Sequence, residues 1–180
     1  MSFVVIPFSD SIVARNMDIG LLVVLAFATI NFLGLLLGAW GSRNKYAIMS
    51  AARVVSQNIA YEIPMLVTIV AIIMVSGSLN MHTIVSQQLG GFWQWNLLNI
   101  KASLLMPAAF LIMFICMLAE TNRAPFDLVE AESELVAGPF IEYSSMGFGL
   151  FFMAEYSNIV IGACLATILF LGGWGCPFGI

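Results

Sequence analysis

The chain contains four long apolar runs, and these constrain its fold more than any other feature. The runs at 19–40, 63–79 and 102–119 contain no charged side chain. A fourth run, at 145–172, is at least as long and contains one charge, Glu155. A bilayer core about 30 Å thick is crossed by about 20 apolar residues in a helix. The pattern therefore predicts an all-α integral membrane protein with four transmembrane helices.

The composition excludes the main alternatives to a membrane protein. Charged residues make up 9% of the chain, whereas a soluble domain contains about 25%. The six Lys and Arg residues are too few for the clustered basic face of a nucleic-acid binder. The apolar runs lack the alternation of barrel strands, so we expect helices. These helices are expected to form a single membrane domain over residues 1–180.

The sequence contains no motif for metal or nucleotide chemistry. Cys116, Cys164 and Cys176 lie far apart, and His82 is the chain's one histidine. Zinc and iron–sulfur sites require closely spaced Cys or His ligands. Walker, GxGxxG, HExxH and GxSxG motifs are also missing. We therefore expect no metal site in this chain and no catalysis by the chain alone.

Basic residues predict the orientation of the chain in the membrane. Arg43, Lys45 and Arg53 lie between the first two apolar runs. Positively charged loops stay in the cytoplasm or an equivalent compartment. Two further crossings place residues 120–143 on that same side, whereas residues 80–100 face outward.

The predicted cytoplasmic loop at 120–143 is strongly acidic. It contains six of the chain's ten acidic residues and a single base, Arg123. The anionic cytoplasmic leaflet repels such a loop, so the loop needs a protein partner, a proton-handling role, or both. Its acids are Glu120, Asp127, Glu130, Glu132, Glu134 and Glu142.

Part of this loop has the spacing of a helix. Pro125 suits a first helical turn, and Asp127, Glu130 and Glu134 would then share one helix face. Like charges this close favour protonated carboxyl groups, so the row could hold and exchange protons. A solvated helix face is the alternative interpretation.

Three carboxyl groups lie within or beside the apolar runs, where charged side chains are rare. Glu155 lies about ten residues, or about 15 Å, into the fourth run, near mid-bilayer. A carboxylate there costs at least about 2.5–3.5 kcal/mol, so we expect it to be neutral or paired within a polar cavity. Glu62 and Glu120 lie at the cytoplasmic ends of the second and third runs. The three acids indicate a proton or cation path, or hydrogen bonds between helices by protonated Glu.

Phenylalanines surround the acidic loop on both sides. Such side chains suit an aromatic ligand such as a quinone ring, although phenylalanines in helices more often form core. They are Phe126, Phe140, Phe148, Phe151 and Phe152.

Residues 120–159, ETNRAPFDLVEAESELVAGPFIEYSSMGFGLFFMAEYSNI, resemble one membrane subunit of respiratory complex I, the NADH:quinone oxidoreductase. This subunit is called H in bacteria and 1 in mitochondria. Three further stretches are similar: AWGSRNKYAIMSAARVVSQNIAYEIP, SGSLNM and LFLGGWGCP. The resemblance covers essentially the whole chain and corresponds to the central spans of a larger, eight-span subunit. LFLGGWGCP favours a bacterial origin, so we expect a multi-pass protein of a bacterial cell inner membrane.

The resemblance implies a non-autonomous subunit of a proton-translocating enzyme. With two peripheral-arm subunits, the family subunit forms the chamber in which quinone is reduced. Quinone would be the substrate, and FMN and iron–sulfur clusters would be held by partner subunits. A chain of acids would lead from the chamber toward antiporter-like membrane subunits.

The resemblance also assigns roles to individual residues. Arg123 would pair with loop acids and hold the loop's shape, while Arg53, Gln57 and Tyr143 would give structural support. Phe126, Phe148, Phe151 and Phe152 would line or border the quinone passage. The proton relay would comprise Glu62, Glu120, Asp127, Glu130, Glu132, Glu134, Glu142 and Glu155. Of these, Glu62, Glu142 and Glu155 would be the buried acids.

Other functions agree with parts of the pattern. Membrane-bound hydrogenases and formate hydrogenlyase contain a similar subunit, usually with a less complete acidic loop. An independent cation–proton transporter would explain Glu62 and Glu155 but not the long acidic loop. A purely structural membrane anchor would leave Glu155 unexplained.

Overall fold

Helices make up the regular structure of the chain. The computed structural model describes residues 2–98, 105–123, 125–126, 140 and 142–175. Over these ranges it contains α-helices and short 3-10 helices, and no strand. The predicted all-α class is therefore confirmed.

Three helices are long and apolar enough to cross a membrane. They are α1 (Gly20–Gly41), α2 (Lys45–Ser76) and α6 (Met146–Phe170). A fourth helix, α4 (Met106–Glu120), is apolar but shorter, and residues 102–104 of its predicted span lie outside the described residues. The helices agree with a four-span membrane protein.

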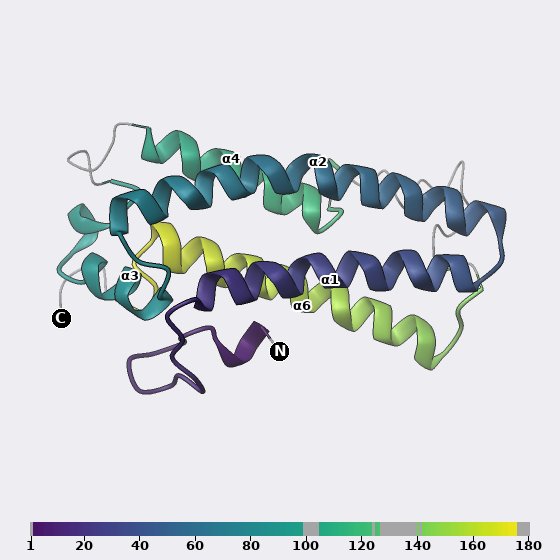
Figure 1. Ribbon diagram of the computed structural model, residues 1–180, viewed down its shortest axis with the longest axis horizontal. Coiled ribbons are helices and arrows are strands. Elements are labelled where there is room, and N and C mark those ends of the chain that lie inside the picture. The colour runs from purple at the N-terminus through teal and green to yellow at the C-terminus, as the bar shows by residue number, and fades with distance from the viewer. Residues whose placement is uncertain (1, 99–104, 124, 127–139, 141, 176–180) are drawn as a thin grey trace.

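The four apolar helices lie lengthwise in one bundle (Figure 1). α4 packs against both α2 and α6, and α1 packs against α2 and α6. Between 17% and 22% of the most apolar stretch of each long helix is buried within the chain. Exposed side chains of this hydropathy suit lipid or neighbouring apolar helices rather than water.

The packed core lies toward one end of the bundle, where α3 (Met81–Gln88) crosses it. The start of α1 and the ends of α2 and α6 meet there. Phe110 of α4 contacts Phe170 of α6 edge-to-face, with ring centroids 5.2 Å apart. The largest core side chains, which are almost fully buried, are Ile6, Leu21, Val24, Ile69, Ile72, Met81, Ile84, Val85, Met113, Leu169 and Phe170.

α2 extends well beyond the predicted span at 63–79. It begins at Lys45, and the side chain of Asn44 caps it by accepting a 3.0 Å hydrogen bond from the Tyr46 backbone N–H. The charged residues that marked this segment as a loop therefore lie on or beside the first turns of a helix. A helix of 32 residues is about 48 Å long. Glu62 consequently lies inside α2 rather than at its start.

Short segments close the α3 end of the bundle. Two 3-10 helices lie there in the chain order, η1 (Ser2–Val4) before α1 and η2 (Phe92–Gln94) after α3. His82 Nε2 lies 2.9 Å from Asp10 Oδ1, which ties the segment after η1 to α3.

A buried amide holds the end of α6 at this closed end. Gln88 Nε2 donates to the Ile168 carbonyl at 2.9 Å. Gln88 Oε1 accepts from the backbone N–H groups of Asn96 and Gly172, each at 3.2 Å. Asn96 Nδ2 donates to the Leu169 carbonyl at 2.8 Å. Gln88 thus satisfies both donors and acceptors that the end of α6 and the following turn leave open.

Replacing this amide should destabilise the α3 end of the bundle. In Gln88→Leu, the Asn96 and Gly172 N–H groups lose their buried acceptor, which costs about 1–3 kcal/mol per unpaired group. We expect a lower thermal unfolding midpoint for the full-length subunit in detergent. Gln87→Leu is the matched control, because Gln87 is exposed and donates one hydrogen bond, to the Ser76 carbonyl. Equal midpoints for the two variants would contradict the role given to Gln88.

Candidate functional site

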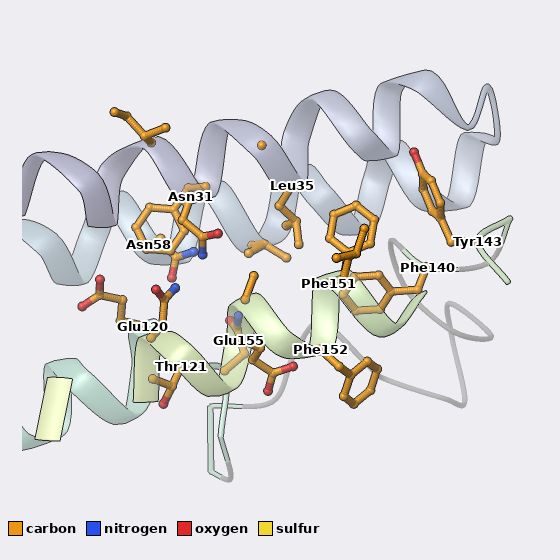
Figure 2. Close-up of a pocket in the computed structure, with 18 of the residues that line it drawn as sticks. Asn31, Leu35, Asn58, Glu120, Thr121, Phe140, Tyr143, Phe151, Phe152 and Glu155 are labelled. Carbon is orange, nitrogen blue, oxygen red and sulfur yellow. The ribbon is translucent and has the colours of Figure 1, made fainter. Parts of the chain in front are cut away.

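A cavity of about 810 Å³ lies where α4 ends, between α1, α2 and α6 (Figure 2). The other three helices continue beyond the level at which α4 stops. Side chains from all four helices, and from the segments that join them, line the cavity. Its polar and charged lining residues include Asn31, Asn58, Glu120, Arg123, Glu155 and Asn158.

The end of α4 has a defined geometry. Asn122 has a left-handed backbone, with φ of 49°. The Arg123 N–H donates to the Leu118 carbonyl at 3.1 Å, and the Asn122 N–H donates to the Ala119 carbonyl at 3.3 Å. This pair of bonds is the Schellman motif, which ends a helix and reverses its direction. The reversal brings Arg123 back toward α6.

Arg123 pairs with the acid in the middle of α6. Arg123 Nη2 lies 3.5 Å from Glu155 Oε1, and the guanidinium also lies over the Tyr156 ring, 5.3 Å from its centroid. The side chains are 45% and 25% exposed, respectively. The expectation that Glu155 is paired within a polar cavity agrees with this contact. The predicted pairing of Arg123 with loop acids involves Asp127, Glu130, Glu132 and Glu134, which lie outside the described residues.

Gln57 connects the middle of α2 to the end of α4. Its Nε2 donates to the Ala119 carbonyl at 2.9 Å and to the Phe126 carbonyl at 3.0 Å. The Phe126 ring packs edge-on against Tyr61, with centroids 5.3 Å apart. These contacts fix where the chain leaves α4. Arg53, one turn earlier, is exposed.

Glu62 and Glu120 lie at the boundary between the cavity and the core. Thr29 Oγ1 of α1 donates to Glu62 Oε1 at 2.7 Å. Glu120 lines the cavity and is half-buried, and its charge and that of Glu62 are close enough to interact. Carboxyl groups from two helices therefore lie near one another at this level.

Asn58 is the least expected polar group at the cavity. It lies on α2 and is only 2% exposed. Neither its amide nitrogen nor its amide oxygen has a hydrogen-bond partner among the described residues. An unpaired buried amide costs about 1–3 kcal/mol. Asn31 of α1 lines the same cavity, and Figure 2 shows both amides within it.

Aromatic side chains form the cavity wall nearest the start of α6. Phe140, Phe151 and Phe152 line it. Phe148 packs against Phe152 with tilted rings, whose centroids are 4.5 Å apart, but it lies outside the lining. Phe126, packed against α2, also lies outside it. Two of the four phenylalanines predicted to border a quinone therefore line this cavity.

Tyr143 and Glu142 lie at the far end of the aromatic wall. The Tyr143 hydroxyl donates to the Gly38 carbonyl at 2.8 Å. A Cβ at Gly38 would lie 2.8 Å from the Phe151 ring, so the ring would have to shift if this glycine were replaced. Glu142 accepts a 2.9 Å hydrogen bond from Asn44 Nδ2 and is exposed. Glu142, which was expected among the buried acids, is exposed in the structure of this chain.

Comparisons with known proteins identify the chain's relatives. The family model described as NADH dehydrogenase matches residues 1–180. The chain belongs to the NADH dehydrogenase family. Among the described residues, no three His, Cys, Asp or Glu side chains form a metal-ligand group.

Three similar relatives carry one name, which describes them as the H subunit of NADH-quinone oxidoreductase. The protein of Desulfotalea psychrophila is 68% identical over 183 residues, which cover 100% of this chain and 55% of the relative. The protein of Ruthia magnifica is 44% identical, covering 98% of this chain and 48% of the relative. The protein of Carboxydothermus hydrogenoformans is 42% identical, covering 99% and 49%. The chain spans about half the length of these relatives.

The contacts of Gln57 predict its effect on the segment after α4. In Gln57→Leu, we expect faster hydrogen exchange at the N–H groups of residues 121–123. Losing two hydrogen bonds of about 1 kcal/mol each would release this turn from α2, so protection should fall at least about fivefold. The measurement is hydrogen-exchange mass spectrometry on the assembled, full-length subunit.

Ser56→Ala provides the matched control for this variant. Ser56 is adjacent but exposed, and its hydroxyl donates within α2, to the Arg53 carbonyl. Unchanged exchange in Gln57→Leu would show that the turn is held by other contacts.

Proposed function

We propose that this chain forms the central helices of a membrane subunit that couples quinone reduction to proton translocation in an NADH:quinone oxidoreductase. The observation that carries the proposal is the cavity at the end of α4. It brings Glu120 and the Arg123–Glu155 pair to one cavity, beside an aromatic wall. Ionisable groups within membrane spans are costly and mark ion or proton pathways.

The proposed proton relay uses carboxyl groups from three helices. Glu62 on α2, Glu120 at the end of α4 and Glu155 on α6 provide the steps inside the bundle. Two of them have a polar partner in the described structure: Glu62 accepts from Thr29, and Glu155 pairs with Arg123. Loop acids would supply protons from the cytoplasmic side: Asp127, Glu130, Glu132, Glu134 and Glu142.

Residues around the relay have different proposed roles. Gln57 and Tyr143 are proposed as structural supports, because they hold the two ends of the cavity. Arg123 would keep Glu155 charged or release it as the loop changes. Phe151 and Phe152 are the proposed contacts for a quinone or its tail, with Phe126, Phe148 and Arg53 placed around them.

Electrons would reach the quinone through partner subunits. We assign FMN and iron–sulfur clusters to peripheral-arm subunits, because this sequence contains no ligand motif for either. The quinone would bind where this chain meets those subunits, and antiporter-like membrane subunits would receive the coupling signal. The relatives are named as a subunit of NADH-quinone oxidoreductase, which favours this enzyme over a hydrogenase-type complex.

The proposed orientation follows the basic residues. Arg43, Lys45 and Arg53 lie at the end of the bundle where α1 joins α2. The positive-inside rule places this end in the cytoplasm of a bacterial cell. The loop after α4 would then face the cytoplasm, and α3 would face the opposite side of the inner membrane.

Removing the charge at the centre of α6 tests the relay. In Glu155→Gln, the side chain keeps its shape but can no longer take up a proton. We expect proton translocation per NADH oxidised to fall several-fold in inverted membrane vesicles that contain the assembled complex. Ser157→Ala is the control, because its hydroxyl donates to the Met153 carbonyl of its own helix. Normal pumping with normal assembly would remove Glu155 from the path.

Substitutions of Arg123 separate charge from geometry. Arg123→Ala should lower NADH:quinone reductase activity several-fold, because Glu155 loses its partner and the turn after α4 loses its contact with α6. Arg123→Lys should restore part of the activity, since an ammonium retains the charge but not the planar guanidinium geometry. Steady-state kinetics and native electrophoresis would measure activity and complex yield. Normal values of both in Arg123→Ala would contradict the proposed role.

A further inference from the structure

The unpaired Asn58 amide indicates that the cavity holds something polar. Asn58 is almost completely buried, and both its amide nitrogen and its amide oxygen lack a partner in the described part of the chain. An amide can donate two hydrogen bonds and accept two. Buried polar groups are nearly always paired with protein or with ordered water. Because Asn58 lines the cavity, the cavity is a place from which a partner can reach this amide.

The surroundings of Asn58 favour water as this partner. The cavity has a volume of about 810 Å³, whereas one water occupies about 30 Å³ in the liquid. Asn31 of α1, Asn158 of α6 and the Glu120 carboxylate line the same space. They offer the additional hydrogen-bonding groups that a buried water needs. An apolar lipid or quinone tail would leave the Asn58 amide unpaired.

The same cavity contains two carboxyl groups on different helices. Glu120 ends α4, and Glu155 lies on α6, one turn before Asn158. Figure 2 shows Glu120 and Glu155 among the side chains around the cavity, with their carboxylates pointing in different directions and Asn58 on the α2 side. Because both carboxylates line one space, water in that space is the smallest group that can connect them.

We propose that Asn58 is a positioning residue that holds a cluster of internal water molecules connecting Glu120 to Glu155. The role in proton transfer rests on the proposed function, whereas the binding of water does not. A neutral amide suits this task, because it orients waters through both a donor and an acceptor without changing its own charge.

Proton transfer through this cluster conserves atoms and charge. The O–H bond of protonated Glu120 breaks, and its proton passes to a water oxygen. A water O–H bond at the other end of the cluster breaks, and that proton passes to the Glu155 carboxylate. Glu120 gains one negative charge, Glu155 loses one, and the water molecules are unchanged in number.

Electron cryo-microscopy of the assembled complex, at a resolution that shows water, tests the binding site directly. The expected result is density for water within hydrogen-bonding distance of both Asn58 Oδ1 and Asn58 Nδ2. An apolar chain in contact with the Asn58 amide, or a protein group bonded to both amide atoms, would overturn the proposal.

Variants of Asn58 in the full-length subunit test the role of the water. In Asn58→Leu, which removes the amide but keeps a similar volume, we expect the coupled proton-translocation rate to fall about tenfold, equivalent to about 1.4 kcal/mol in the barrier. Asn58→Thr should retain most of the rate, because its hydroxyl can still bind a water. Val54→Ala is the matched control: Val54 lines the cavity one turn earlier on α2, and its replacement removes no polar group.

The outcomes distinguish this inference from the proposed function. Loss of pumping in Glu155→Gln with full pumping in Asn58→Leu would reject only the positioning role of Asn58. Full pumping in Glu155→Gln would reject the proposed function, even if water is found at Asn58. If Asn58→Leu lowers the yield of the complex, the rate of Asn58→Thr and the water density in the native complex decide the question. Loss of pumping in Asn58→Thr equal to that in Asn58→Leu would also count against water binding.

Discussion

The early end of α4 is the constraint on which the candidate site depends. A Schellman motif stops this helix at Glu120, and Pro125 follows closely, where the chain can no longer continue a helix. α1, α2 and α6 continue past this level, so the space between them is lined by side chains from these helices, the last residue of α4 and the segments that join them. The same motif returns Arg123 toward α6. One local backbone feature therefore produces both the cavity and the ion pair at its edge.

The bundle has a tightly packed apolar core at one end and a cavity with polar side chains toward the other. At the α3 end, large apolar side chains are fully buried, and Gln88 pairs the open backbone groups of α6. At the other end, the cavity collects carboxyl, guanidinium and amide groups. A charge at this depth is costly unless it is paired or hydrated. The polar groups lie around one cavity, where the Arg123 guanidinium pairs with Glu155 and several side chains share the same space.

The sequence predicts the helices well where hydropathy alone decides. The uncharged run at 19–40 and the run at 145–172 correspond closely to α1 and α6. The sequence underestimates the length of α2, because Lys45 and Arg53 interrupt the apolar pattern although both residues are compatible with a helix. Hydropathy predicts which residues lie in lipid, and the first turns of α2 are helical without being apolar enough to lie there.

The site is only partly predictable, because burial and pairing depend on tertiary contacts. The cost of an isolated charge predicts that Glu155 needs a partner, but only the turn after α4 shows that Arg123 reaches it. The motif that contains Glu142 does not show how deeply this side chain lies, and in the structure its carboxylate is exposed and accepts a hydrogen bond from Asn44. The sequence does not distinguish Asn58 from other polar residues, because its amide carries no charge. Only the packed bundle shows that both atoms of this amide are buried without a hydrogen-bond partner among the described residues.

The hydrogen bonds of Gln88 hold one end of α6, at Ile168 and Gly172. Glu155 lies about 15 residues, or about 22 Å, from this fixed end. A tilt of about 5° around the fixed end moves Glu155 by about 2 Å for a straight helix of this rise. Such a displacement would be enough to break the contact with Arg123, which is 3.5 Å long. A small angular change in α6 would therefore have its effect at Glu155 and not at the packed end of the bundle.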